Sequence, residues 1–260
     1  MLPDQSARRL HWDACYNARD LGGYATADGA RTRWGAFVRA DNLSRLTPAG
    51  QAALIEYGVR TVIDLRRAFE LTIDLNPFAT PSDATRVVTY LNLPLGLGAD
   101  RKGTLAVQAA GEGDDAALSA IFCQVLDHYG RGIAGVMTAI AVAPPGAVLF
   151  HCHAGKDRTG MIAALLLALA GVPNATIAED YALSQLCLQP IFDQRLSQQP
   201  DPAKREQMVQ MMGAVPETML GVLAYLDERH GGAARYLRAA GVVEPDLERL
   251  RQRIREDYRL

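Results

Sequence analysis

The sequence predicts an α/β fold in which a central, mostly parallel sheet is flanked by helices. Two short apolar runs, Val59–Leu65 and Ala147–His151, have the length and composition of buried strands. Helical patterns lie between and after them, such as the apolar stretch Arg158–Leu169, which Gly171 and Pro173 would end. Strands that alternate with helices favour a parallel sheet covered on both faces.

The first half of the chain carries clear signals for turns and helix ends. Asp28-Gly29 is typical of a hairpin turn before a strand. Thr47-Pro48 has the pattern of a helix N-cap and first turn, and Gly58 is expected to end that helix. Two further stretches of this half are expected to be strands: Trp34–Arg39 and Arg86–Leu93.

The second half is expected to be mostly helical. Ile121–Ile140 has a helical pattern with a break near Gly130-Gly132, and Asn174 can cap a helix that runs to about Leu188. Two later helices open at prolines and align apolar residues on one face. These are Met219, Val222, Leu223 and Leu226 after Pro216, and Leu247, Leu250 and Ile254 after Pro245.

One domain over residues 1–260 is the simplest organisation for a chain of this length. Two segments rich in turn-forming residues interrupt the pattern. Leu97–Ala117 is expected to be a loop or insertion, and Gln198–Lys204 a second break. The helical region at about 190–232 is a candidate lid over a pocket.

The composition excludes several classes of protein. The net charge of -2 gives no global basic field for nucleic acid, so an anionic substrate must meet local positive charge. No apolar run approaches the roughly 20 residues that cross a bilayer, and no secretory signal is evident. We therefore expect a cytoplasmic protein, with export by a dedicated route left open. The cysteines lack zinc spacing, so no metal or cofactor is expected. The oligomeric state stays open.

The junction between the predicted strand and helix at His151–Gly160 contains the most reactive side chain. Cys152 lies at the end of the strand, just before the helix begins. A thiol is a weak nucleophile until it ionises. Because unpaired N–H groups at a helix N-terminus favour negative charge, they would stabilise a thiolate here and bind a phosphate dianion above it.

The rest of this loop completes a cradle for phosphate. Gly155 lets the chain curl so that successive N–H groups point inward. Arg158, six positions after Cys152, can return to the loop's rim, where its planar fork suits two phosphate oxygens. The expected phosphate contacts are His153, Ala154, Gly155, Lys156, Asp157 and Arg158. A nucleophile at the base of such a cradle is what phosphoryl transfer requires.

Four neighbours have expected supporting roles. Thr159 can donate its hydroxyl proton to the sulfur, which eases departure of the thiolate from phosphocysteine. His151 can orient the loop through hydrogen bonds. Lys156 adds charge for a second phosphate or an acidic head group. His153 is either a solvent-facing rim residue or a substrate contact.

Two other interpretations of the loop compete with this one. A Walker loop would need Gly at position 150 and Ser or Thr at position 157, whereas the chain has Phe150 and Asp157. A buried structural role is common for a lone cysteine, but Cys152 lies among chemically active residues at a strand-helix junction. The remaining cysteines are expected to be structural: Cys15, Cys123 and Cys187.

The pattern C-x5-R, preceded by His and followed by Thr, resembles the protein tyrosine phosphatase signature. The whole run from residue 151 to 160 is similar to an atypical bacterial and fungal branch of tyrosine and lipid phosphatases. Further matches follow in the family's order: Asn17–Tyr24, Val38–Ala40, Ile63–Arg66 with Glu70, and Glu179–Ser184. The resemblance implies a tyrosine phosphatase-like fold, a cysteinyl-phosphate intermediate, and activity on phosphotyrosine, sometimes on phosphoserine, phosphothreonine or phosphoinositides.

A general acid must protonate the leaving oxygen. Neither Trp12 nor Trp34 is followed by Pro-Asp, so the mobile acid loop of many tyrosine phosphatases is missing. The resemblance implies that the aspartate inside the loop, Asp157, does this work. The alternative is that Asp157 only pairs with Arg158 or braces the loop.

Asp64 is the second candidate acid, because it ends a strand and strand ends of such sheets line ligand sites. Its alternative role is a structural ion pair with Arg19 or Arg39. Three aspartates in the expected insertion, where a lid could carry an acid, are weaker candidates: Asp100, Asp114 and Asp115.

The leading hypothesis is therefore a phosphatase that acts on phosphotyrosine in proteins, with phosphoserine and phosphothreonine as further substrates. A second is a phosphoinositide or inositol phosphate phosphatase, which Lys156 favours. A third is a phosphate-binding module without catalysis, against which the intact Cys152, Asp157 and Arg158 speak. An arsenate reductase would need further reactive thiols near the site, and none is evident.

Overall fold

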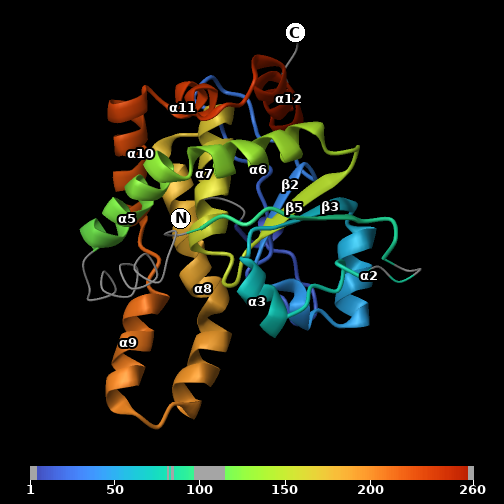
Figure 1. Ribbon diagram of the computed structural model, residues 1–260, viewed down its shortest axis with the longest axis vertical. Helices are drawn as coiled ribbons and strands as arrows, with labels where there is room; N and C mark the ends of the chain where they lie inside the picture. The colour runs from blue at the N-terminus through green and yellow to red at the C-terminus, as the bar shows by residue number, and fades with distance from the viewer. Residues whose placement is uncertain (1–4, 81, 83–84, 97–114, 257–260) are drawn as a thin grey trace.

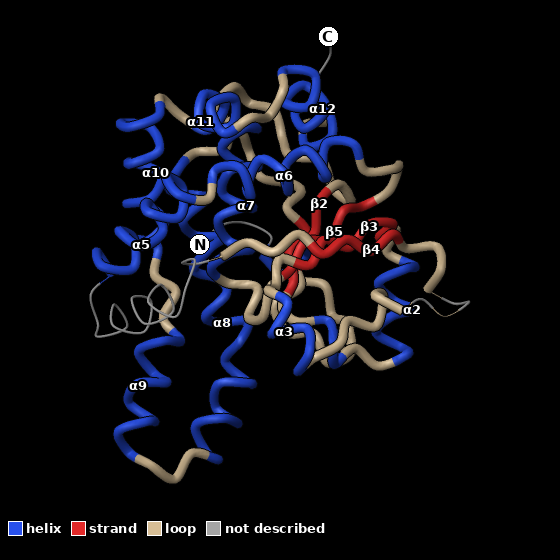
Figure 2. Tube along the Cα trace, in the orientation of Figure 1, coloured by secondary structure: helices blue, strands red, loops and turns tan. Residues whose placement is uncertain are grey.

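A computed structural model describes residues 5–80, 82, 85–96 and 115–256, and its helices surround a five-stranded sheet (Figures 1 and 2). The strands are β1 (Arg19–Asp20), β2 (Phe37–Ala40), β3 (Val59–Asp64), β4 (Thr89–Asn92) and β5 (Ala147–His151). Their spatial order is β1-β2-β5-β3-β4. Only β1 pairs antiparallel, with β2, and the other three pairs are parallel. The predicted mostly parallel sheet is therefore confirmed.

The helices are α1 (Gln5–Arg8), α2 (Pro48–Glu56), α3 (Ala68–Ile73), α5 (Asp115–His128), α6 (Gly130–Val142), α7 (Asp157–Ala170), α8 (Asn174–Gln198), α9 (Pro202–Met212), α10 (Pro216–His230), α11 (Ala233–Ala240) and α12 (Glu244–Ile254). A short 3-10 helix, η1, spans Leu43–Arg45.

The two faces of the sheet have separate apolar cores, because side chains of a strand alternate in direction. Val148 and Phe150 of β5 pack with the helical layer of α5 to α8 and α10 to α12. Ala147 and Leu149 pack with the N-terminal segment and with Leu54 of α2. The central strands are thus covered on both sides, as their near-continuous apolar sequences indicate.

Most predicted elements are confirmed, with small shifts at their ends. Thr47 caps α2 by accepting a hydrogen bond from the amide of Gly50 at 3.2 Å. The long helix predicted over Ile121–Ile140 is divided at Tyr129 into α5 and α6. Gly171, with φ of +85°, ends α7 as expected. Neither β1 nor α11 was predicted, because β1 has two residues and α11 only eight.

The prediction that the helix after Asn174 ends near Leu188 was wrong, since α8 continues through Pro190 to Gln198. A proline inside a helix loses one hydrogen bond and clashes with the preceding turn. Here the next turn buries Ile191 and Phe192, which offsets that cost. The N-cap position is also Pro173 rather than Asn174.

The segment at about 190–232, which was expected to form a lid, consists of two different parts. The second half of α8 and α9 run side by side away from the sheet (Figure 1). In contrast, α10 packs on α5 and α8, with Met219 fully buried in the main core. The insertion expected at Leu97–Ala117 lies almost wholly outside the described residues. Among those described, no helix is both long and apolar enough to cross a membrane.

Candidate active site

The loop that carries Cys152 connects β5 directly to α7, as the sequence predicts. Cys152 is buried, with 3% of its surface exposed. Gly155 has φ of +65°, and a Cβ atom there would lie 2.3 Å from the carbonyl oxygen of Ala40. Glycine is required at this position for two reasons, its left-handed backbone and its contact with β2. The tight curl of the loop depends on it.

The carbonyl oxygens of five successive loop residues all accept hydrogen bonds from groups outside the loop. His151 Nδ1 lies 3.0 Å from the oxygen of Cys152, and the amide of Asn42 donates to His153 at 2.9 Å. The remaining bonds are Asn17 Nδ2 to Ala154 at 2.9 Å and Arg39 Nη2 to Gly155 at 2.8 Å and Lys156 at 3.3 Å.

This arrangement fixes the direction of the loop's amide groups. In a trans peptide the N–H points opposite to the C=O, so outward carbonyls turn the following amides toward the concave side. Within the described part of the chain, the amides of His153, Ala154 and Gly155 donate no hydrogen bond. Together with the N-terminus of α7, they make this loop a candidate anion site.

Arg158 is held at the rim by a carboxylate from α3. Its Nη1 and Nη2 atoms each lie 2.7 Å from an oxygen of Glu70, and Nη1 also lies 3.3 Å from the carbonyl of Leu65. Burial alone would lower the pKa of Arg158, but Glu70 and Cys152 raise it. Burial would raise the pKa of Glu70, and Arg158 lowers it. The pair is therefore charged and oriented beside Cys152.

Asp157 lies at the start of α7 with its side chain 23% exposed. The hydroxyl of Tyr181 donates to Asp157 Oδ1 at 3.2 Å, and Lys156 Nζ lies 3.7 Å from the same oxygen. The hydrogen bonds of Arg158 go instead to Glu70 and Leu65. Asp157 is thus partly open to solvent beside the candidate anion site, an exposure that a proton donor to a leaving group would need.

Lys156, whose charge was expected to meet a second phosphate or an acidic head group, is buried instead. Its side chain is 7% exposed, and Nζ donates to the carbonyl of Gly213 at 2.7 Å, at the junction between α9 and α10. His153, in contrast, is 43% exposed and has Nε2 3.9 Å from Asp74. Burial and the Arg195 guanidinium lower the pKa of His153. His153 therefore lies on the rim, and Lys156 joins the loop to the helical arm.

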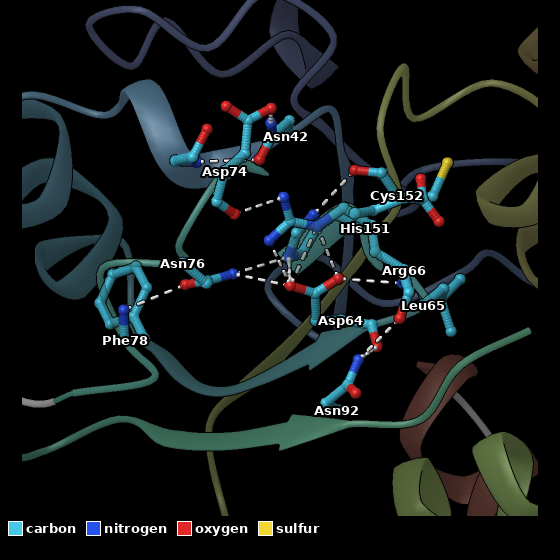
Figure 3. Close-up of polar contacts among 12 residues, drawn as sticks. Asn42, Asp64, Leu65, Arg66, Asp74, Asn76, Phe78, Asn92, His151 and Cys152 are labelled. Atoms are coloured by element: carbon cyan, nitrogen blue, oxygen red, sulfur yellow. Dashed lines mark hydrogen bonds and ion pairs between the residues drawn. The ribbon is translucent and has the colours of Figure 1, made fainter. Parts of the chain in front are cut away.

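Asp64 lies in a closed polar network below the loop (Figure 3). It is fully buried and pairs with Arg66 at 2.7 Å, and its Oδ2 also lies 3.3 Å from His151 Nε2. Asn76 Nδ2 lies 3.2 Å from Asp64 and 2.9 Å from His151 Nε2. Burial would raise the pKa of Asp64, but His151 and Arg66 lower it. A buried, paired carboxylate of this kind supports His151 and does not face a leaving group.

The expected ion partners of Asp64 were wrong. Arg19 and Arg39 pair with Asp180 of α8, on the other side of β5, whereas Asp64 pairs with the nearby Arg66. The structure also bears on the expected roles of Thr159 and of the three aspartates in the insertion. Thr159 Oγ1 is buried without a hydrogen-bond partner among the described residues, so its expected bond to the sulfur is not formed. Asp100 and Asp114 lie outside the described residues, and Asp115 begins α5.

Several residues that hold the loop were not among the predicted site residues: Asn17, Arg39, Asn42, Glu70 and Asp180. All except Asn42 belong to motifs that accompany the loop in the sequence. Those motifs were the available signal, but their contacts with the loop are visible only in the fold.

Comparisons with known proteins identify the family of the chain. A model of the family described as "Tyrosine phosphatase family" matches residues 10–256. The chain therefore belongs to the tyrosine phosphatase family and is a phosphatase, as its sequence resemblance implies.

Two curated relatives cover most of the chain. A tyrosine-protein phosphatase of Nostoc commune is 38% identical over 229 residues, which are 84% of this chain and 74% of the relative. The triple specificity protein phosphatase PtpB of Mycobacterium tuberculosis is 28% identical over 268 residues, which cover 91% of this chain and 95% of the relative. Among solved structures, Pseudomonas aeruginosa TpbA is similar, with a TM-score of 0.32 and 19% sequence identity. The match covers 73% of this chain and 85% of TpbA. The fold assignment rests on the sheet topology rather than on this likeness.

Proposed function

We propose that this phosphatase hydrolyses phosphotyrosine in proteins through a cysteinyl-phosphate intermediate on Cys152. The observation that carries the proposal is the set of five carbonyls whose oxygens are held by hydrogen bonds, because the amides that follow them then turn to the opposite side of the loop that carries Cys152. Arg158, held by Glu70, lies at the rim of the same loop. Such a site complements the equatorial oxygens of a phosphoryl group in transfer.

The reaction then has two steps. The sulfur of Cys152 attacks phosphorus, the bond to the tyrosine oxygen breaks, and Asp157 gives its proton to that oxygen. A water molecule next attacks the phosphocysteine, Asp157 takes a proton from it, and the thiolate departs with inorganic phosphate released. The same carboxyl group thus serves as acid and then as base.

Phosphoserine and phosphothreonine are proposed as further substrates. The PtpB relative is described as a triple specificity protein phosphatase, and its match covers 91% of this chain. The phosphoinositide alternative depended on Lys156 offering charge to a second phosphate. Because Lys156 is buried and donates to Gly213, that argument loses its support, and the protein substrate is favoured.

A substrate panel with a Cys152→Ser control tests the proposal. Turnover of phosphotyrosine, phosphoserine and phosphothreonine peptides and of a phosphoinositide is measured for both proteins. The wild type should act fastest on phosphotyrosine, and the variant should bind phosphate without turnover. Undiminished turnover by the variant would contradict the role of Cys152. Faster turnover of the phosphoinositide than of the phosphotyrosine peptide would contradict the proposed substrate preference.

We also propose that the arm formed by the second half of α8 and by α9 acts as a lid. Leu188, Ile191 and Phe192 of α8 pack against Ala154 of the loop and Met212 of α9, so the base of the arm is continuous with the site. Hydrogen exchange in α9 should slow when vanadate occupies the loop. Equal exchange with and without vanadate would exclude the lid.

A further inference from the structure

Three charged side chains are buried together on the β2 side of the loop. They are Arg19 of β1, Arg39 of β2 and Asp180 of α8, with side chains at most 2% exposed. Arg39 Nη1 pairs with Asp180 Oδ2, and Arg19 Nε lies 3.3 Å from Oδ1. Tyr24 donates its hydroxyl to the same carboxylate at 3.0 Å. One carboxylate thus serves two guanidinium groups, so the cluster carries one excess positive charge.

Arg39 connects this cluster to the phosphate-binding loop. Its Nη2 donates to the carbonyls of Gly155 and Lys156, and lies 3.4 Å from Ser184 Oγ. A Cβ atom on Gly160 would lie 3.5 Å from the same nitrogen, so the guanidinium also borders the first turn of α7. The excess charge therefore lies directly behind peptide groups whose amides face the anion site.

The pKa shifts of the cluster are those expected when one carboxylate faces two buried guanidinium groups. Burial and the Arg19 guanidinium lower the pKa of Arg39. Burial would also lower the pKa of Arg19, but Asp180 raises it. Burial would raise the pKa of Asp180, and the two arginines lower it to about 2. A single carboxylate cannot offset two buried cations, and uncompensated buried charge is costly unless another partner is supplied.

Other charged groups around the cluster already have partners. The carboxylate of Asp41, after β2, accepts bonds from the Cys15 thiol and from the amides of Tyr16 and Asn17. Lys156 pairs with Asp157, and Arg158 pairs with Glu70. His151 faces Asp64, and Cys187 lies 4.0 Å from Arg19 Nη1. The natural partner for the excess charge is an anion within the loop.

We propose that Arg39 is a positioning residue for catalysis. It holds the carbonyls of Gly155 and Lys156 away from the substrate, and its excess charge stabilises the Cys152 thiolate and the bound phosphate from behind. Asp180 and Arg19 set the size of that charge. This assignment rests on the proposed function, and it gives the motifs Asn17–Tyr24, Val38–Ala40 and Glu179–Ser184 one shared role.

Variants of opposite charge distinguish this role from mere support of the fold. Arg39→Gln removes a positive charge and Asp180→Asn removes a negative one, and both disturb the same cluster. The ultraviolet absorbance of the thiolate is titrated with pH, and the signal of the same variant carrying Cys152→Ser is subtracted. The midpoint should rise by roughly half a unit to one unit in Arg39→Gln and fall by a similar amount in Asp180→Asn. Equal midpoints, or shifts in one direction, would overturn the proposal.

Two further variants complete the experiment. Arg253 donates to the carbonyls of Ala143, Pro144 and Gly146, near the opposite end of β5, so Arg253→Gln should lower stability without moving the midpoint. Arg39→Lys keeps the charge but loses the planar guanidinium that contacts two carbonyls. The midpoint of its thiolate titration should therefore match that of the wild type, while its affinity for inorganic phosphate, measured by calorimetry, falls several-fold. If Arg39→Gln does not fold, a large midpoint shift in Arg39→Lys or none in Asp180→Asn still overturns the proposal. An inactive wild type would refute the proposed function alone, because the titration needs no turnover.

Discussion

The loop is held from two sides that differ in charge and in what they hold. On the β3 side, Asp64 pairs with Arg66 and Glu70 pairs with Arg158, each at 2.7 Å, so each carboxylate has one close guanidinium partner. The partly exposed Arg67 lies farther from Glu70, at 3.8 Å. On the β2 side, Arg19 and Arg39 share Asp180. The β3 side orients side chains, since it contacts Arg158 and His151. The β2 side orients the backbone, since Arg39 contacts two carbonyls.

This difference indicates a division of labour within one site. Balanced ion pairs fix geometry with little effect on the net field, whereas an unbalanced buried charge changes the field at the loop. Disturbing the β3 side should therefore weaken contact with the transition state. Disturbing the β2 side should change the ionisation of the nucleophile and the acid stability of the fold.

The largest effect is expected from the β3 side, in Arg158→Lys. Lysine keeps the charge but cannot hold two phosphate oxygens or both oxygens of Glu70. We expect kcat/KM for a phosphotyrosine peptide to fall by about 10²–10³-fold, the usual cost of losing one preorganised donor. The control is Arg67→Lys, which changes a half-buried neighbour of Glu70 that lies 3.8 Å from it. Equal losses in both variants would mean that the fork of Arg158 has no special role.

An intermediate effect is expected at Asp157, which lies between the two sides. Asp157→Asn should lower the rate for an alkyl phosphate by about 10²-fold, within the range of general acid catalysis. A phenyl phosphate with a good leaving group needs less protonation and should lose less. Rates for both substrates are compared in wild type and variant. The same loss for both would assign Asp157 to bracing the loop instead.

The smallest effect is expected in the acid stability of the β2 side. The pKa of Asp180 is lowered to about 2, below the unfolded value near 3.9. Its contribution is therefore present above pH 4 and is lost as pH falls toward 2, amounting to about 2 kcal/mol. Urea unfolding at several pH values should show this loss in wild type and not in Asp180→Asn. A parallel decline in both proteins would contradict the assigned pKa.

The sequence predicted the central sheet and the nucleophile loop well because both depend on local pattern. Val59–Asp64 and Ala147–His151 are apolar runs of strand length, and Cys152 to Gly160 is a dense local motif. The extent of α8 was not predicted, because Pro190 is a local stop signal that the burial of Ile191 and Phe192 overrides. Tertiary packing decided that boundary.

The supports of the loop lay beyond sequence reasoning for a similar reason. Arg39 reaches Gly155 across 116 positions of the chain, and Arg19 reaches Asp180 across 161. No local pattern tells which of several charged side chains will meet, and the expected pairing of Asp64 with Arg19 or Arg39 failed on that point. Lys156 was likewise expected to offer its charge to a second phosphate, whereas the fold places the carbonyl of Gly213 beside it.

The identity of the phosphorylated atom during turnover tests the central claim most directly. Wild-type protein is mixed with a phosphotyrosine peptide, quenched rapidly, and digested for mass spectrometry. The account predicts a phosphoryl group on the sulfur of Cys152, which disappears as substrate is exhausted. Phosphate on another residue, or full turnover in which no phosphocysteine forms at any quench time, would contradict it.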